Sequence, residues 1–474
     1  MSLRRQVLNF EGKRTDFRVG CGASDELSRM FKGTVARPRL AVLVADRQAT
    51  ELYGTQVCRG LVDAGFEVRG FALDEDRDPK ELSTAVLLLE ELGHLGATAE
   101  DLVVALGDAD TCSLVTFCAA SWCGGMPYVL VPTTLDAMVS SATVMRGLSA
   151  GDAAYMVSVQ PHATLVVCDL DLVLDAPIEE RGLGLVQIVA AYLSWGRKYW
   201  EGIDEVIDDL AGGGENAYKT AVSEAQTSHV NALKSTSPSA RNALLYGCTT
   251  ARALRACLGP DVPWYLLLAE GMRFEARLAT EACGFSVDDV FKQDDCFEEL
   301  GIEELPFSLD TEEFIAALKA ERLCRANRFM LPLPKRAGFI RLTSVDDEVL
   351  ERHAEAYLAS REELLEEVEE GAGEAADDED AGYDDADDSD ADSDAGYDAG
   401  YDPAADDSDV DAAADDSDVG TDTDSGYDPA ADDSDADDAD ISSYDPAADD
   451  SDVDDDGSSA DGSDEGPAEA FADE

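Results

Sequence analysis

Short apolar runs alternate with helical periodicity between residues 17 and 170. Five of these runs are predicted to form buried strands, because they are apolar and bounded by turn residues: 40–46, 67–73, 102–107, 127–131 and 163–168. Two intervening segments have helical character, residues 47–64 and 79–95. Strands that alternate with helices in this way predict a mostly parallel sheet connected by crossover helices.

The pattern changes after residue 170, where strand signals almost vanish. Four long segments have helical periodicity: residues 178–200, 217–233, 240–258 and 264–283. The simplest interpretation is a Rossmann-like α/β domain over residues 1–170 followed by an all-helical domain over residues 171–361. A chain of this length suits two packed domains, and the cleft between them would be the expected place for a ligand.

The last part of the chain, residues 362–474, has a different composition. It contains 49 acidic residues and no Lys or Arg, and it repeats Tyr-Asp-Pro-Ala-Ala-Asp-Asp-Ser-Asp from Tyr401, Tyr427 and Tyr444. Such a segment cannot bury enough apolar surface to offset the entropy lost on ordering, so we expect a disordered acidic tail. A solvated polyanion of this kind would bind cations or basic partners loosely.

The charge of residues 1–361 argues against one class of partner. This part carries 54 acidic and 35 basic side chains, a net charge of −19, which opposes binding to nucleic acid. The eleven cysteines of the chain show no paired spacing, and no apolar stretch reaches the ~20 residues of a membrane span. The first residues lack the apolar run of a signal peptide, so we expect a reducing, cytoplasmic location.

Small and hydroxylated residues follow the central strands, where a nucleotide could bind. Gly107 and Asp108 come at the end of one predicted strand, and Thr133 and Thr134 follow the next. Their backbone N–H groups and hydroxyls would suit a pyrophosphate or a ribose. The two threonines would serve equally well as a helix N-cap. Asp46 could accept a hydrogen bond from an adenosine ribose, or could equally cap a turn.

The order of several motifs resembles the 3-dehydroquinate synthase family over most of residues 10–360. The landmarks are the strand and loop at 103–107, Val-Pro-Thr-Thr-Leu at 131–135, Gln160-Pro161, Arg241-Asn242-Ala243-Leu244 and Gly271-Met272. Their order and spacing are maintained over a long part of the chain. The resemblance implies an N-terminal α/β domain that binds NAD and a helical domain that completes the cleft.

The resemblance also implies a reaction and its cofactors. Members of the family bind NAD and a divalent metal, usually zinc. They are carbon–oxygen lyases of the shikimate pathway, which leads to the aromatic amino acids, and convert a seven-carbon keto-acid phosphate into a carbocycle. Hydride transfer to NAD, phosphate elimination, return of the hydride and ring closure follow one another, with the metal as Lewis acid. The family further implies a homodimer.

The three metal-ligand positions of the family fall on residues that do not suit a metal. These positions are Gln187, Cys248 and Trp264, where the family has a glutamate and two histidines. Gln187 is neutral, Trp264 cannot ligate a metal, and Cys248 alone supplies a single soft ligand. The four histidines of the chain are too scattered to suggest a replacement cluster. We therefore expect no zinc site.

Other functional positions of the family are also substituted. Arg146 replaces a lysine and Arg252 replaces the catalytic histidine of the helical domain, whereas Arg241 is retained. Arg241 could still bind a phosphate or carboxylate through two hydrogen bonds. Lys80 falls near a lysine nucleotide contact of the family, although the altered spacing favours an exposed charged loop. Asp108 would face a pyrophosphate with like charge, which weakens the case for NAD.

Two functional hypotheses follow. The first is a catalytically degenerate descendant that acts as a binding or scaffold protein through its cleft, a dimer face or the acidic tail. The second is a working 3-dehydroquinate synthase, or a related sugar-phosphate cyclase or dehydrogenase, with a replacement site. Substitution of the metal ligands favours the first, because loss of the metal would remove several kcal/mol of transition-state stabilisation.

Overall fold

The computed structural model describes residues 3–10, 12–73, 76–151, 153–321 and 326–380, with side chains described as far as Val368. All of these residues belong to one compact unit. The expected disordered tail lies, from residue 381 onward, outside the described residues.

A seven-stranded sheet has the strand order β1-β2-β9-β6-β5-β3-β4. Its strands are β1 Arg4–Phe10, β2 Lys13–Gly20, β3 Leu40–Ala45, β4 Glu67–Ala72, β5 Leu102–Gly107, β6 Tyr128–Pro132 and β9 Leu165–Asp169. Only β1 pairs antiparallel, with β2, and the other neighbours in the sheet pair parallel. The predicted mostly parallel sheet is confirmed, and the β1–β2 hairpin adds two strands that the hydrophobic pattern did not indicate.

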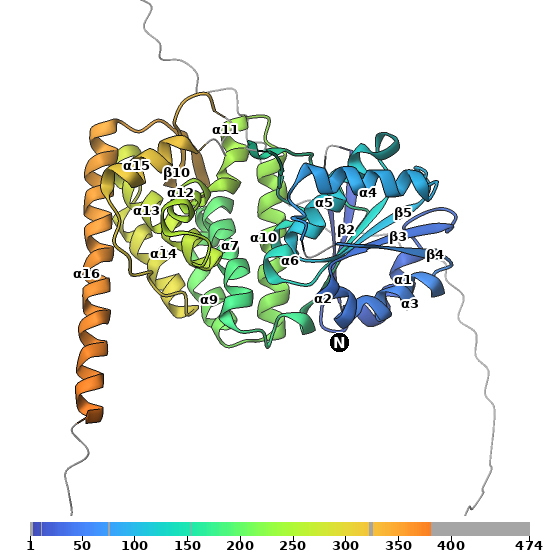
Figure 1. Ribbon diagram of the computed structural model, residues 1–474, viewed down its shortest axis with the longest axis horizontal. Helices are drawn as coiled ribbons and strands as arrows, with labels where there is room; N and C mark the ends of the chain where they lie inside the picture. The colour runs from blue at the N-terminus through green and yellow to red at the C-terminus, as the bar shows by residue number, and fades with distance from the viewer. Residues whose placement is uncertain (1–2, 11, 74–75, 152, 322–325, 381–474) are drawn as a thin grey trace, which may run out of the picture. The chain divides into compact units, whose positions relative to one another are not determined.

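Strand β3 is buried on both faces because its alternate side chains enter two different cores. Val42 and Val44 belong to the core that includes residues of α4 (Leu82–His94) and α5 (Ala109–Ser121). Leu43 packs instead in the core that includes residues of α1 (Leu27–Phe31) and α3 (Thr55–Asp63). Figure 1 shows these helix pairs on opposite faces of the sheet. Continuous apolar runs are what a strand covered on both faces requires.

The carboxyl ends of the central strands lie at the same edge of the sheet. The register pairs Ala45 of β3 with Leu106 of β5, and Gly107 of β5 with Pro132 of β6. Residues that follow these strands therefore emerge side by side, as in other open parallel sheets. The shorter elements around this part are η1 Ala23–Glu26, α2 Arg47–Ala49, η2 Thr50–Gly54, η3 Trp122–Gly124, α6 Leu135–Ser140, β7 Leu148–Ala150, β8 Ala153–Val157 and η4 Leu170–Leu172.

Helices dominate the chain after β9. They are α7 Ile178–Trp195, α8 Arg197–Glu201, α9 Ile203–Ala211, α10 Glu215–Leu233, α11 Pro238–Arg241, η5 Asn242–Leu245, α12 Cys248–Leu258, α13 Trp264–Cys283, α14 Val287–Glu299, α15 Thr311–Ala320 and α16 Asp347–Asp380. This arrangement confirms the predicted helical region. It also contains a hairpin that was not anticipated, β10 Leu331–Arg336 with β11 Phe339–Thr343, whose turn includes Gly338 at φ 79°.

Helix α16 is held to the helical region by a buried group of charges. It packs against α13 and α15 and runs along one edge of this region (Figure 1). Arg361 of α16 forms ion pairs with Glu270 over 3.1 Å and with Glu304 over 2.9 Å, and Arg273 donates to Glu270 over 2.7 Å. These bonds satisfy charges that would be costly to bury alone. The helix continues to Asp380, past the point at which the polar tail was expected to begin.

Helices α12 and α13 approach each other at two glycines. A Cβ atom on Gly271 of α13 would lie 2.2 Å from the carbonyl oxygen of Gly247, and Gly247 itself has φ 77°. The buried carboxylate of Glu275 accepts a 2.8 Å hydrogen bond from the Gly247 N–H and another of 2.8 Å from the Thr250 hydroxyl. The small residues permit the contact, and Glu275 fixes the first turn of α12.

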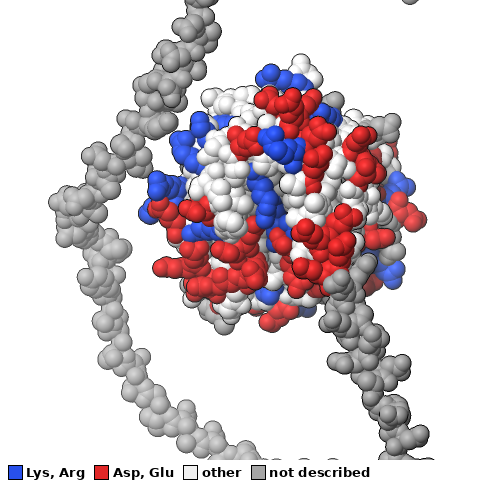
Figure 2. Space-filling view, turned by 90° about the vertical axis from the view of Figure 1, so that its left-hand side faces the viewer, with Lys and Arg blue, Asp and Glu red and all other residues white. Residues whose placement is uncertain are grey.

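Acidic side chains cover much of the face shown in Figure 2, and basic side chains are interspersed among them. Such a face would repel a polyanion. None of the helices that the structure describes combines the length and the apolar character needed to span a bilayer. None of the cysteines within the described residues forms a disulfide bond.

We predict that Gly271→Ala destabilises the protein by about 1–3 kcal/mol, because the added methyl group meets the backbone of α12. Gly70→Ala is the matched control, since a Cβ atom at Gly70 meets nothing within 4 Å. Urea denaturation of both variants gives the two free energies of unfolding. Equal midpoints for the two variants would show that α12 and α13 are not in close contact.

We also predict a pH dependence that arises from Glu275. Burial raises the pKa of its carboxyl from 4.5 to about 8, although hydrogen bonds from Gly247 and Thr250 act in the opposite direction. Between these two pH values the Glu275 carboxyl is protonated in the folded state and ionised in the unfolded state. Protonation of Glu275 therefore stabilises the folded state, and this contribution is complete below pH 4.5 and is lost as pH rises through about 8.

The measurement is the free energy of unfolding as a function of pH for the wild type and for Glu275→Gln. The wild type should lose stability relative to this variant as pH rises across that window. The exposed substitution Glu298→Gln should leave the wild-type pH profile unchanged. A wild-type free energy of unfolding that stays constant, or rises, with pH relative to that of Glu275→Gln would contradict the assignment.

Candidate functional site

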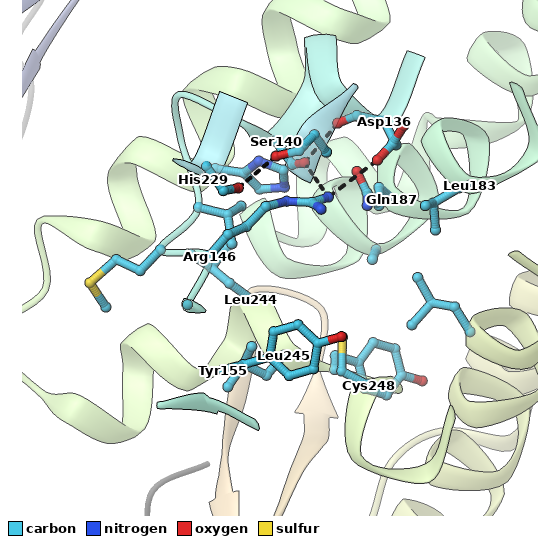
Figure 3. Close-up of a pocket in the computed structure, with 18 of the residues that line it drawn as sticks. Asp136, Ser140, Arg146, Tyr155, Leu183, Gln187, His229, Leu244, Leu245 and Cys248 are labelled. Atoms are coloured by element: carbon cyan, nitrogen blue, oxygen red, sulfur yellow. Dashed lines mark hydrogen bonds and ion pairs between the residues drawn. The ribbon is translucent and has the colours of Figure 1, made fainter. Parts of the chain in front are cut away.

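A cavity of about 1040 Å³ lies between the carboxyl edge of the sheet and the helices that follow it. One wall is formed by residues that follow β4, β5 and β6, together with the β7–β8 hairpin. The other is formed by α7, α10, α11, α12 and the start of α13. Figure 3 shows side chains from both walls directed toward the cavity. This is the expected cleft, and it has the size and shape of a small-molecule site.

The three family metal-ligand positions converge in this cavity. Gln187 of α7, Cys248 at the start of α12 and Trp264 at the start of α13 all line it. The side-chain amide oxygen of Gln187, Oε1, is buried and has no hydrogen-bond partner among the described residues. Within these residues, no group of three His, Cys, Asp or Glu side chains has an arrangement that could hold a metal ion. The residues present therefore do not fit a zinc site.

Arg146 lies at the centre of a polar network on the sheet side (Figure 3). Its guanidinium donates to the Ser140 hydroxyl over 2.8 Å and to the Asp136 carboxylate over 3.3 Å. The Thr134 hydroxyl donates to the other oxygen of Asp136 over 2.6 Å. Arg146 also lies 4.0 Å from Asp110. The charge of Arg146 is thus compensated by carboxylates of the same wall.

Lys80 and Asp108 line the same wall but have different partners. The Lys80 ammonium forms a 2.8 Å ion pair with Asp110, so it is not the fully exposed loop residue that its spacing favoured. Asp108 caps α5, where its carboxylate accepts a 2.9 Å hydrogen bond from the Thr111 N–H. Burial raises the pKa of Asp108, and the nearby charge of Asp110 raises it further.

Three of the predicted nucleotide contacts are not among the residues that line the cavity. Asp46 caps α2 by accepting a 2.7 Å hydrogen bond from the Ala49 N–H, which matches the alternative interpretation of this residue. Gly107 has φ 156°, and the Thr133 N–H donates to its carbonyl oxygen over 2.9 Å. A carboxylate already caps the first turn of α5, where a pyrophosphate would be received. The residues present do not fit NAD in that position.

Three arginines line the helical side. Arg252 forms a 2.7 Å ion pair with Glu321 and lies 4.6 Å from the centre of the Tyr155 ring. Arg241 donates to the Ser235 carbonyl oxygen over 2.9 Å. Arg255 donates to backbone carbonyls at the end of α12 and lies 5.7 Å from the centre of the Trp264 ring. Arg146, Arg241 and Arg252 thus all line one cavity.

Sequence reasoning missed several cavity residues, among them His229, Asp136 and Tyr155. The Nδ1 atom of His229 lies 3.1 Å from the Thr143 hydroxyl, and burial lowers the pKa of the ring to about 4, so His229 is neutral at pH 7. Tyr155 has φ 58°, an unusual value for a residue with a side chain. Tyr155 offered no signal in the sequence.

Comparison with known proteins finds relatives in sequence. The sequence model described as the N-terminal part of 3-dehydroquinate synthase matches residues 71–188. The 3-dehydroquinate synthase of Pelotomaculum thermopropionicum is 28% identical over 255 residues, which are 52% of this chain and 67% of that protein. The residues that the sequence model matches, 71–188, include β5, β6 and the first part of α7, which carry much of the cavity wall.

Solved structures share the fold at low sequence identity. A 2-deoxy-scyllo-inosose synthase, solved with carbaglucose-6-phosphate, NAD+ and Co2+, superposes with a TM-score of 0.63 at 16% identity, covering 74% of this chain and 99% of the other. An iron-containing alcohol dehydrogenase superposes with a TM-score of 0.53 at 14% identity, covering 74% and 99%. The sequence matches show that this chain is similar to 3-dehydroquinate synthases, and the superpositions show that it shares the fold of these solved structures.

Proposed function

We propose that this protein binds a small polar ligand in the cavity as a metal-independent binding or scaffold protein. It does not carry out the NAD- and metal-dependent cyclisation of a seven-carbon keto-acid phosphate. One observation carries the proposal: the three family metal-ligand positions lie together in the cavity but are occupied by Gln187, Cys248 and Trp264. The framework that would place a metal is kept, and the groups that would bind it are replaced.

The replacement is chemically decisive for this reaction. A metal Lewis acid stabilises the charge that develops on substrate oxygens, and each factor of ten in rate corresponds to about 1.4 kcal/mol of barrier. An amide, one thiol and an indole do not supply the three donors that a catalytic zinc needs. Arginine at position 252 adds charge without proton transfer at neutral pH, since a guanidinium stays protonated.

The place at which the resemblance would put NAD also has side chains that oppose its binding. Asp108 occupies the first turn of α5 with a carboxylate, and Asp110 lies close to it. A pyrophosphate placed there would meet two like charges instead of free N–H groups. Asp46, which could have bound a ribose, is engaged in capping α2. These contacts support a cavity that binds its ligand without NAD.

We predict no phosphate release from the seven-carbon keto-acid phosphate when the full chain is incubated with NAD and zinc or cobalt. The reason is the missing metal-ligand set. Release is measured against a no-enzyme blank, on protein whose fold is verified by circular dichroism. Metal-dependent release above the blank, abolished by a chelator, would instead establish the second hypothesis, a working cyclase with a replacement site.

We further predict that a metal site can be restored at these positions. The triple variant Gln187→Glu, Cys248→His, Trp264→His should bind Co2+ saturably and show its visible absorption, because a carboxylate and two imidazoles then face one cavity. The wild type should not bind.

The matched control for the restored site places the first histidine elsewhere on α12. It carries Cys248→Ala and Cys257→His in place of Cys248→His, so that position 248 supplies no donor, and position 257 is not among the residues that line the cavity. This control should not bind Co2+. Equal binding by the triple variant and by the control would mean that the three positions do not converge.

A further inference from the structure

The cavity contains charged groups of opposite sign that lack an ion-pair partner. Its other charged groups compensate one another: Lys80 pairs with Asp110, Arg146 pairs with Asp136, and Arg252 pairs with Glu321. The groups that remain indicate which ligand charges the cavity would favour. This inference rests on the proposed function, that the cavity binds a small ligand.

The sheet wall has one carboxylate in excess. Asp108 accepts a hydrogen bond from the Thr111 N–H, but no Lys or Arg in the described part of the chain lies within ion-pair distance of it. The two cations of this wall, Lys80 and Arg146, are both engaged with other carboxylates. An uncompensated carboxylate in a partly buried cavity is unfavourable, and a ligand cation would relieve it.

The helical wall has cations in excess. Arg241 and Arg255 donate only to backbone carbonyls, and among the described residues no carboxylate lies within ion-pair distance of either. A guanidinium with free N–H groups binds a phosphate or a carboxylate in a bidentate manner. The buried side-chain amide oxygen of Gln187 also lacks a hydrogen-bond donor, and a ligand hydroxyl could supply one.

We propose that the cavity binds a zwitterionic, hydroxylated small molecule, with its ammonium group at Asp108 and its anionic group at Arg241 and Arg255. Both unpaired charges are compensated only when one ligand carries both groups. A sugar-sized molecule fits within about 1040 Å³. The pKa of Asp108 is raised by burial and by Asp110, which is consistent with a carboxylate that has no ion-pair partner.

The test compares three related probes by isothermal titration calorimetry on the full chain. Glucosamine 6-phosphate carries both charges, glucose 6-phosphate lacks the ammonium group, and glucosamine lacks the phosphate. We expect glucosamine 6-phosphate to bind at least about tenfold more tightly than either of the others, a difference of about 1.4 kcal/mol. Equal affinity for the two phosphates, or no binding of glucosamine 6-phosphate at millimolar concentration, would overturn the inference.

Two variants assign the charges to their walls. Asp108→Asn keeps an N-cap residue on α5 but removes the charge, so it should lower the affinity for glucosamine 6-phosphate to that for glucose 6-phosphate. Arg241→Gln keeps a donor for the Ser235 carbonyl and should weaken binding of both phosphates. Asp46→Asn, at a cap that does not line the cavity, is the control and should change nothing.

The outcomes separate this inference from the proposed function. If Asp108→Asn weakens both phosphates equally, the ammonium assignment is wrong, while a metal-independent binding cavity still stands. Phosphate release from the keto-acid phosphate would overturn the proposed function, whatever the calorimetry shows. The binding measurement involves no turnover, so neither result depends on the other.

Discussion

The close contact of α12 with α13 at Gly247 and Gly271 determines where the helical wall of the cavity lies. Glycine at both positions allows the two backbones to come into contact. The Glu275 carboxylate accepts a hydrogen bond from the Gly247 N–H and so holds the first turn of α12. That turn places Cys248, and the same helix carries Arg252 and Arg255 into the cavity. A shift of this contact would move each of these groups, so the geometry of the site depends on backbone packing.

The framework and the chemistry of this cavity are separable. The apolar strands, the glycines and the helix contacts make the fold, and none of them needs a metal. Side chains that face the cavity contribute little to packing and can change without loss of the fold. In this cavity many of the charged side chains form internal ion pairs, such as Lys80 with Asp110 and Arg252 with Glu321.

Much of this arrangement was predictable because it depends on periodicity. Strand β5 and helix α13 follow directly from an apolar run and from helical spacing. The β1–β2 hairpin was not predicted, since its edge strand is largely exposed and has no apolar run. Whether Asp46 binds a ribose or caps a helix depends on one hydrogen bond, which composition does not reveal. Tyr155 lines the cavity from the short strand β8, and no pattern in the sequence marks it.

The central claim is that the cavity keeps the place of a metal site without its ligands. The most direct measurement is an anomalous-difference map from crystals of the full chain grown with Co2+ and NAD. The account predicts no cobalt peak beside Gln187, Cys248 and Trp264, and none elsewhere in the cavity. A cobalt peak coordinated by side chains that line the cavity would contradict it and would identify a replacement metal site.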